Sequence, residues 1–182
     1  PQNNQKLADI AGGTGDIAKK FLEGGGGSAH VYDINQELLK RGQNKNSMSQ
    51  KIKWTIASAE KIPATEGYFE RATIGFGLRN ITKRVKCLKE IYRILKPGGR
   101  LICLEFSHVE NDLIRKFYDT WSFDFMPTLG KKITGDRHAY TYLVESIRQF
   151  PSQPELAQMF SEAGFSRVKY RNLSYGIVAL HS

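Results

Sequence analysis

A glycine-rich segment near the start of the chain carries the residue types that a nucleotide cofactor requires. Residues 9–16 read D-I-A-G-G-T-G-D, and the glycines at 13 and 15 fit the pattern G-x-G-x-x-A. Glycines let a ligand approach the backbone closely, and the N–H groups that open a following helix can bind it. Asp33 lies 20 residues past Gly13, where a carboxylate accepts both hydroxyls of a ribose. This spacing predicts a nucleotide-cofactor site, and it suits NAD as well as other nucleotides.

Acidic residues on both sides of the glycines favour S-adenosylmethionine over NAD. Asp9 precedes the glycines and Asp16 follows them. Carboxylates attract the ammonium and sulfonium groups of S-adenosylmethionine and repel a pyrophosphate. Residues 57–60 (ASAE) follow the third expected strand. At this position, enzymes that bind S-adenosylmethionine contact the adenine edge with a polar side chain and a backbone N–H. An NAD-dependent dehydrogenase remains an alternative at this point.

Alternating strands and helices are expected to position these residues. The sequence predicts strands at 6–11, 28–33, 51–57, 69–76 and 101–106, and helices at 17–23, 36–41 and 81–95. The helix at 81–95 has the clearest signal because its apolar residues recur on one helical face. The pattern indicates an α/β protein with a doubly wound, mostly parallel sheet.

Beyond residue 107 the pattern changes. Apolar helical faces are predicted at 113–125, 140–147 and 156–163, and two closing strands at 167–170 and 176–180 resemble an antiparallel hairpin. We expect one domain over residues 1–182, with a helical insertion at 108–150 before the closing strands. The string GGGGS at 24–28 is expected in a surface connection without chemistry.

Composition excludes several classes of protein. Hydrophobic residues make up 40% and charged residues 25% of 182 residues, as in an ordinary folded domain and not in a disordered or collagen-like chain. Cys87 and Cys103 have no spacing typical of a zinc site or a disulfide framework, so no metal is expected. The 27 basic and 18 acidic residues give a net charge of +9, which favours nucleic acid, an anionic membrane or an acidic partner.

Stretches spread over the whole chain resemble the ubiquinone/menaquinone biosynthesis C-methyltransferase family, a branch of the class I S-adenosylmethionine-dependent methyltransferases. They are AGGTGD (11–16), GFGLRN (75–80), LKPGGR (95–100), CLEFS (103–107), YLVESI (142–147), FPSQ (150–153) and GIVALHS (176–182). The segments GFGLRN, LEFS and YLVESI are specific to this branch. The resemblance implies a Rossmann-like α/β fold with a seven-stranded sheet, an antiparallel last strand and S-adenosylmethionine as cofactor.

The family's cofactor positions correspond to a set of residues in this chain. They are Thr14, Asp33, Ser58, Ala59 and Gly75, with backbone groups of Gly13 and Gly15. Asp9 is also expected to contact the cofactor, because its carboxylate would attract the ammonium and sulfonium groups of S-adenosylmethionine. Three departures weaken the match: Ser58 replaces Asn or Asp, Gly75 replaces the Ser of many bacterial members, and Ala11 replaces the first glycine of the class I motif.

The reaction that the resemblance implies moves a methyl group from the sulfonium to a ring carbon of a polyprenyl benzoquinol. A demethylmenaquinol is the alternative acceptor. The ring carbon becomes nucleophilic when a neighbouring hydroxyl loses its proton, so the site must align the atoms, stabilise a phenolate and accept a proton. Arg79 and Asn80 are the leading candidates for holding the phenolate, and Glu105 is expected to act as base or to orient Arg79. A purely structural ion pair between Arg79 and Glu105 is the alternative.

The expected insertion offers weaker candidates. Tyr118, Asp119 and His138 are possible bases, although surface or packing roles suit each of them better. The aromatic residues at 117–125 suit a channel for the prenyl tail or ordinary helix packing. Four basic residues of this region are hypothesised to face an anionic membrane: Lys131, Lys132, Arg137 and Arg148.

The resemblance also implies partners and a compartment. We expect peripheral association with the inner membrane, a quinone-biosynthesis complex and a homodimer, and we expect the family's N-terminal helices to be absent from this chain. The segments CLEFS (103–107) and RQFPSQ (148–153) resemble those of mitochondrial members of the family. This favours a location on the matrix side of the inner membrane over a bacterial cytoplasm. A scaffold that binds S-adenosylmethionine without turnover remains an alternative. Nucleic acid is not an expected partner, because the segment after the fourth strand lacks the Asn/Asp-Pro-Pro-aromatic motif of base methyltransferases.

Overall fold

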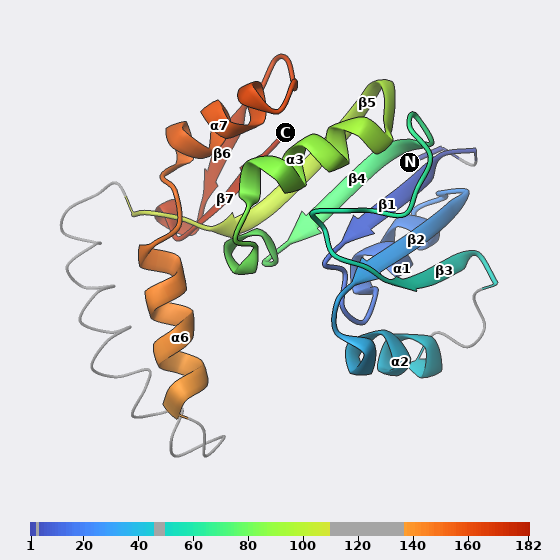
Figure 1. Ribbon diagram of the computed structural model, residues 1–182, viewed down its shortest axis with the longest axis horizontal. Coiled ribbons are helices and arrows are strands. Elements are labelled where there is room, and N and C mark those ends of the chain that lie inside the picture. The colour runs from blue at the N-terminus through green and yellow to red at the C-terminus, as the bar shows by residue number, and fades with distance from the viewer. Residues whose placement is uncertain (3, 46–49, 110–136) are drawn as a thin grey trace.

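The computed structural model describes residues 1–2, 4–45, 50–109 and 137–182, and its centre is one seven-stranded sheet (Figure 1). The strand order is β3-β2-β1-β4-β5-β7-β6. The first five strands pair in parallel, and β7 runs antiparallel to both β5 and β6. The predicted fold class and the antiparallel last strand are therefore confirmed. The strands are β1 (Lys6–Ile10), β2 (Ser28–Asp33), β3 (Ile52–Ile56), β4 (Phe69–Gly75), β5 (Leu95–Phe106), β6 (Tyr170–Leu173) and β7 (Val178–His181).

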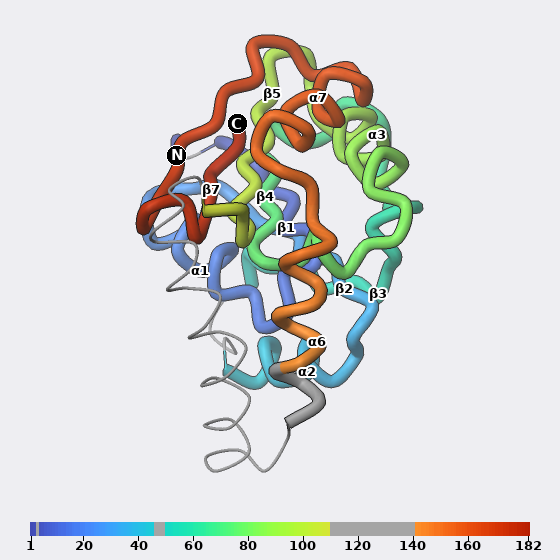
Figure 2. Tube along the Cα trace, turned by 90° about the vertical axis from the view of Figure 1, so that its left-hand side faces the viewer, coloured from blue at the N-terminus to red at the C-terminus, as the bar shows by residue number. Residues whose placement is uncertain are grey.

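Helices cover both faces of the sheet (Figure 2). One face packs on α1 and α2 through a small core around Leu7, Val31 and Leu39. The other packs on α3 and α7 through a larger core that includes Leu88 and Phe160. The described helices are α1 (Asp16–Glu23), α2 (Gln36–Lys45), α3 (Arg84–Ile94), α6 (Arg137–Arg148) and α7 (Gln153–Glu162), with short 3-10 turns η1 (Leu78–Asn80) and η3 (Ser174–Gly176).

Several element boundaries differ from the prediction, including the last two strands, which are Tyr170–Leu173 and Val178–His181. Two other differences have clear local reasons. Helix α3 begins at Arg84 and not at residue 81, because η1 occupies 78–80 and Ile81 has extended backbone angles. Strand β5 begins at Leu95, directly after α3, and not at 101. Phe69 pairs with Leu95 while Arg71 pairs with Arg100, so the KPGG segment bulges out of the ladder. The glycine at 98 has φ +76°, which the left-handed backbone of this bulge requires.

Several predictions concern residues outside the described part of the chain. The aromatic face at 113–125, Tyr118, Asp119, Lys131 and Lys132 lie outside the described ranges. Helix α6 contains positions 137 and 138, but their side chains are not among those described. Within the described ranges, no helix is both long and apolar enough to cross a membrane.

Candidate functional site

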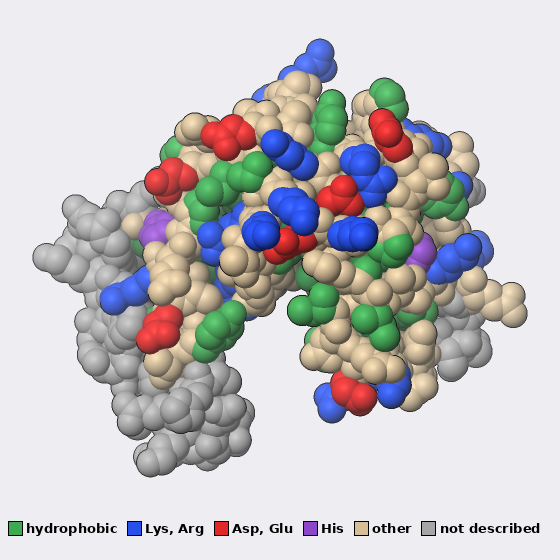
Figure 3. All heavy atoms as spheres, in the orientation of Figure 1, with side chains coloured by type: hydrophobic (Ala, Val, Ile, Leu, Met, Phe, Trp, Pro, Cys, Tyr) green, Lys and Arg blue, Asp and Glu red, His purple; other side chains and the backbone are tan. Residues whose placement is uncertain are grey.

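A cavity of about 430 Å³ lies at the carboxyl ends of the central strands, next to the glycine loop. Parallel strands present their carboxyl ends at one edge of the sheet, which is where ligands bind in folds of this type. The surface is hollowed between α6 and α2, with hydrophobic side chains on both walls (Figure 3). The lining residues are Ala11, Gly13, Asp33, Ile34, Leu38, Ala57, Ser58, Ala59, Glu60, Phe76, Gly77, Asn80, Ile81 and Thr82.

Asp33 is the best-positioned acidic residue of this cavity. The backbone N–H of Gly13 donates to its Oδ2 at 2.9 Å, and the N–H of Asn35 donates to its Oδ1 at 2.8 Å. A carboxylate has about four lone-pair sites, so each oxygen retains the capacity to accept one ribose hydroxyl. Gly13 has φ +54°, and this left-handed turn brings its N–H towards Asp33. The structure thus brings together the glycine loop and the acid predicted to bind a ribose.

Asp9 lies beneath the loop and does not line the cavity. Its side chain is fully buried, accepting hydrogen bonds from the Thr73 hydroxyl at 2.8 Å and the Ala18 N–H at 3.2 Å. Burial raises the pKa of this carboxyl to about 6. A Cβ atom on Gly12 would lie 2.8 Å from the Asp9 carboxyl carbon. In this structure Asp9 therefore supports the loop from below and is not among the cavity-lining residues.

Asp16, which the sequence analysis expected near the ammonium or sulfonium group of the cofactor, binds Lys45 and Thr14 in this structure. Its carboxylate is exposed, binds the Lys45 ammonium at 2.8 Å and accepts the Thr14 hydroxyl at 2.6 Å. These hydrogen bonds, that of Lys45 first, lower the pKa of Asp16. Asp16 is not among the residues that line the cavity. Thr14 is accordingly oriented towards Asp16 and is not among the cavity-lining residues.

Gly15 and Gly75 are explained by close packing against neighbouring side chains. A Cβ atom on Gly15 would lie 2.5 Å from the Trp54 ring, and one on Gly75 would lie 2.9 Å from the Ile17 side chain. Neither glycine is among the residues that line the cavity. Of the predicted cofactor residues, the structure places Gly13, Asp33, Ser58 and Ala59 on the cavity wall.

Ile34 and Leu38 form an apolar part of the cavity wall that the sequence analysis missed. Ile34 follows Asp33 directly and is 74% exposed, which is unusual for an isoleucine. An exposed apolar side chain beside a ribose-binding acid offers a flat base a surface to pack on. The sequence did contain a signal for this wall, because Ile34 is an apolar residue directly after Asp33, where the strand ends.

The charge of the lining residues fits S-adenosylmethionine and not a dinucleotide. Asp33 and Glu60 supply two carboxylates, and the lining residues contain no Lys or Arg. These carboxylates would repel the pyrophosphate of a dinucleotide, and no cation of the cavity lining would offset that repulsion. The same carboxylates would stabilise a sulfonium. Asp33, the apolar wall and the loop N–H groups are the groups that would hold the cofactor's ribose and base.

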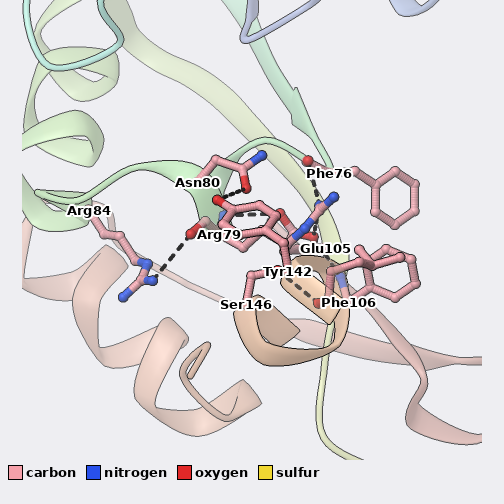
Figure 4. Close-up of polar contacts among 9 residues, drawn as sticks. Phe76, Arg79, Asn80, Arg84, Glu105, Phe106, Tyr142 and Ser146 are labelled. Atoms are coloured by element: carbon pink, nitrogen blue, oxygen red, sulfur yellow. Dashed lines mark hydrogen bonds and ion pairs between the residues drawn. The ribbon is translucent and has the colours of Figure 1, made fainter. Parts of the chain in front are cut away.

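Arg79 and Glu105 form a buried ion pair behind the cavity rim (Figure 4). The Arg79 Nη1 lies 2.8 Å from the Glu105 Oε1 and also donates to the Phe76 carbonyl. Glu105 is 1% exposed and accepts further hydrogen bonds from the N–H groups of Arg79 and Phe106, at 3.2 and 2.9 Å. The guanidinium lies over the Phe106 ring, 5.3 Å from its centroid. The ion pair given as an alternative for Arg79 is present.

This arrangement assigns Glu105 a positioning role. A buried carboxylate that accepts three hydrogen bonds is engaged by those donors, which favours the orienting role expected for Glu105 over the role of base. It fixes the guanidinium of Arg79 and the backbone of η1 instead. The cationic charge of Arg79 then lies one residue from Asn80, which does line the cavity.

Tyr142 completes the rim and was not recognised as a site residue. Its hydroxyl donates to the Asn80 Oδ1 at 3.0 Å, linking α6 to the end of η1 (Figure 4). The sequence contained a signal for it, because Tyr142 opens the family-specific segment YLVESI. Amphipathic periodicity alone did not identify it, since Tyr142 is on the exposed side of its helix.

Comparison with protein families gives one match over the whole chain. Residues 1–182 match the model of the ubiE/COQ5 methyltransferase family.

Curated relatives are similar over most of this chain. The chain is 50% identical to the "Ubiquinone/menaquinone biosynthesis C-methyltransferase UbiE" of Brucella anthropi over 179 residues, which is 96% of the chain and 68% of that protein. It is 50% identical to the protein of that name from Brucella abortus strain S19, of which it covers 66%. The Rickettsia bellii protein is 47% identical, and the alignment covers 100% of the chain and 77% of that protein. The chain thus spans about two thirds to three quarters of these bacterial relatives.

Solved structures with a similar fold include methyltransferases of low sequence identity. A putative methyltransferase from Haloferax volcanii, solved with its activator, gives a TM-score of 0.74 at 15% identity and covers 99% of this chain and 82% of its own. Phosphoethanolamine N-methyltransferase 2 of Haemonchus contortus, solved with S-adenosyl-L-methionine, gives 0.70 at 16% identity and covers 96% and 36%. At such identities the similarity concerns the fold.

Proposed function

Because the chain belongs to the ubiE/COQ5 methyltransferase family, we propose that it methylates a ring carbon of a reduced polyprenyl benzoquinol in ubiquinone biosynthesis. S-adenosylmethionine is the cofactor, as expected from the sequence. The observation that carries the proposal is the cavity that Asp33 and Asn80 both line, with the Arg79–Glu105 pair next to Asn80.

The residues of the chain have distinct tasks in this reaction. When bound, S-adenosylmethionine supplies an electrophilic methyl group. Asp33 and the apolar wall of Ile34 and Leu38 hold the nucleoside end. Arg79, fixed by Glu105, supplies positive charge near the rim, which favours the phenolate form of a bound quinol. The phenolate would make the neighbouring ring carbon nucleophilic. As that carbon bonds the methyl group, the methyl–sulfur bond would break and S-adenosylhomocysteine would leave. The ring would then lose its C–H proton to water, and the phenolate oxygen would regain a proton.

The acceptor must be reduced, and this requirement gives the test. Chain and methyl donor are incubated with a 2-methoxy-6-prenyl benzoquinol kept reduced, and in parallel with its oxidised quinone. We expect a methylated product from the quinol alone, because the quinone has no hydroxyl proton to lose. Methylation of the quinone, or absence of product while S-adenosylhomocysteine binds, would overturn the proposal. The latter result would favour the scaffold alternative.

The compartment and the partners belong to the same proposal. The curated relatives are bacterial proteins whose names include both ubiquinone and menaquinone, so a demethylmenaquinol in a bacterial cytoplasm is the second candidate setting. The first is the matrix side of the mitochondrial inner membrane, supported by the CLEFS and RQFPSQ wording. A prenylated acceptor resides in a membrane, which supports peripheral membrane association. A quinone-biosynthesis complex and a homodimer are proposed from the family resemblance alone.

A further inference from the structure

Tyr142 connects the helix beside the cavity to the residue that faces the acceptor. Its hydroxyl donates to the Asn80 Oδ1 at 3.0 Å, and its side chain approaches Asn80 across the rim in Figure 4. Tyr142 is 57% exposed, so burial of its ring does not explain its position. The hydroxyl–amide contact is the specific feature of this residue.

This hydrogen bond sets the orientation of the Asn80 amide. An asparagine side chain has one acceptor oxygen and one nitrogen with two donors. Because the oxygen accepts from Tyr142, the nitrogen points away from the tyrosine (Figure 4). None of the hydrogen bonds found among the described residues uses the Asn80 nitrogen, and Asn80 lines the cavity. An unused pair of N–H donors is therefore held at the reaction end of the site.

Helix α6 is packed firmly enough to hold Tyr142 in place. Val144 and Ile147 are each 8% exposed. At the end of the helix, the Phe150 carbonyl accepts from the His108 Nε2 at 2.7 Å, and the Phe150 ring lies 5.3 Å from the Arg84 guanidinium. The Arg84 Nη2 in turn contacts the Arg79 carbonyl at 3.4 Å. Besides the contact made by Tyr142, the segment just after the helix is thus linked to η1 through Arg84.

We propose that Tyr142 is a positioning residue for the acceptor: it orients the Asn80 amide so that its N–H donates to a ring oxygen of the bound quinol. The inference rests on the proposed function and identifies the Asn80 amide as a group that recognises the quinol substrate. Hydrogen bonding to this oxygen strengthens as it gains phenolate charge, so the contact contributes to rate as well as to binding. The carboxylate of the cofactor is the other oxygen ligand that two N–H donors suit, and the experiment separates the two.

The test compares Tyr142→Phe with wild type by calorimetry, using 2-methoxyhydroquinone as the probe and S-adenosylhomocysteine present at saturation. We expect the hydroquinone to bind roughly tenfold more weakly, because the Asn80 amide is no longer held in the orientation in which its N–H donates to the ring oxygen. The affinity for S-adenosylhomocysteine and the melting temperature are expected to stay the same. Tyr92→Phe is the control, since Tyr92 is 50% exposed on α3 and its ring packs against Phe165 away from the cavity.

A double variant tests whether Tyr142 acts through Asn80. In an Asn80→Ala background, Tyr142→Phe should change the affinity for hydroquinone, and kcat and KM for the quinol, by less than twofold. Equal losses in both backgrounds would overturn the positioning role, and weaker S-adenosylhomocysteine binding by Tyr142→Phe would assign the contact to the cofactor instead. Wild type that binds the hydroquinone but never methylates the quinol would refute the proposed function, whereas hydroquinone affinity unaffected by Tyr142→Phe would refute this inference alone.

Discussion

Asp33 shows how the surroundings of one residue decide its role. Two backbone N–H groups hold its carboxylate, and it lines the cavity. Asp16, by contrast, is bound to Lys45 at the surface. Both residues carry the same charge and flank the same loop, yet one is placed to receive a ligand and the other to fasten α1 to α2.

Substitution of Asp33 by Asn should weaken binding of S-adenosylhomocysteine by roughly 10- to 100-fold, because hydrogen bonds to a charged acceptor are lost. Titration calorimetry measures the change. Asp16→Asn is the matched control and should alter the affinity by less than about threefold, since an exposed ion pair contributes little. Equal losses in the two variants would contradict the assignment of the ribose site to Asp33.

Asp9 predicts a pH dependence of stability. Burial raises its pKa from 3.8 to about 6, so the folded chain binds a proton more tightly than the unfolded chain. Its contribution to the free energy of unfolding is therefore largest below pH 4 and declines as the pH rises to about 6. Relative to Asp9→Asn, wild type should lose about 3 kcal/mol of stability between pH 4 and pH 7.

Urea denaturation at several pH values measures this difference. Other carboxylates titrate in both proteins and cancel in the comparison. If the stability difference between wild type and Asp9→Asn stayed constant over the range, Asp9 would not be the buried protonated group described above.

Residues whose role depends on neighbours close in sequence could be predicted, and those that depend on tertiary contacts could not. Gly13 and Asp33 were identified because a strand, a turn and a helix fix their relation locally. The role of Glu105 depends on three donors from η1 and β5, and that of Tyr142 on a contact 62 residues away in sequence. No local sequence pattern encodes these contacts, and the family-specific segment YLVESI was the only indication that Tyr142 belongs to the site.

At the scale of elements, two glycines allow α2 and the cofactor loop to pack on one tryptophan. Cβ atoms on Gly15 and Gly42 would lie 2.5 and 2.6 Å from the Trp54 ring, and that on Gly42 would also lie 2.7 Å from the Thr14 carbonyl. A glycine inside a helix usually destabilises it by about 1 kcal/mol relative to alanine. At Gly42 this cost is offset by close packing.

Gly42→Ala should therefore destabilise the chain although it improves helix propensity. Overpacking typically costs about 1–3 kcal/mol, which exceeds the gain. Because Trp54 also contacts the loop, binding of S-adenosylhomocysteine should weaken as well. The double variant Gly42→Ala/Trp54→Leu, which removes the clash with the ring but not the one with the Thr14 carbonyl, should regain part of both losses in thermal denaturation and calorimetry. A stability gain in the single variant would contradict the packing argument.

The order and type of the described elements followed from periodicity, but several ends did not. Alternation of strand and helix indicated the parallel sheet, and β2 was predicted with its observed bounds. Helix α2 extends to Lys45 beyond its apolar signal, because hydrogen bonding continues after the buried face ends. The start of β5 depends on pairing with β4, which only the assembled sheet provides.

At the scale of the whole molecule, the net charge of +9 predicts electrostatic attraction to anionic membranes. Each basic side chain near such a surface contributes about 1 kcal/mol, and salt screens this attraction. The chain should cosediment with phosphatidylserine vesicles at low salt, less at physiological salt, and not with neutral vesicles. Neutralising Lys131, Lys132, Arg137 and Arg148 together should reduce binding. Unchanged cosedimentation of that variant would contradict the role assigned to these four residues.

The reaction itself is tested most directly by locating the transferred methyl group. The chain is supplied with S-adenosylmethionine labelled at the methyl carbon and with a reduced 2-methoxy-6-prenyl benzoquinol, and the product is examined by carbon NMR. The account predicts that the label appears as a methyl group bonded to a ring carbon. A label on a hydroxyl oxygen would contradict it, because the phenolate would then be the nucleophile and not a means of activating the ring.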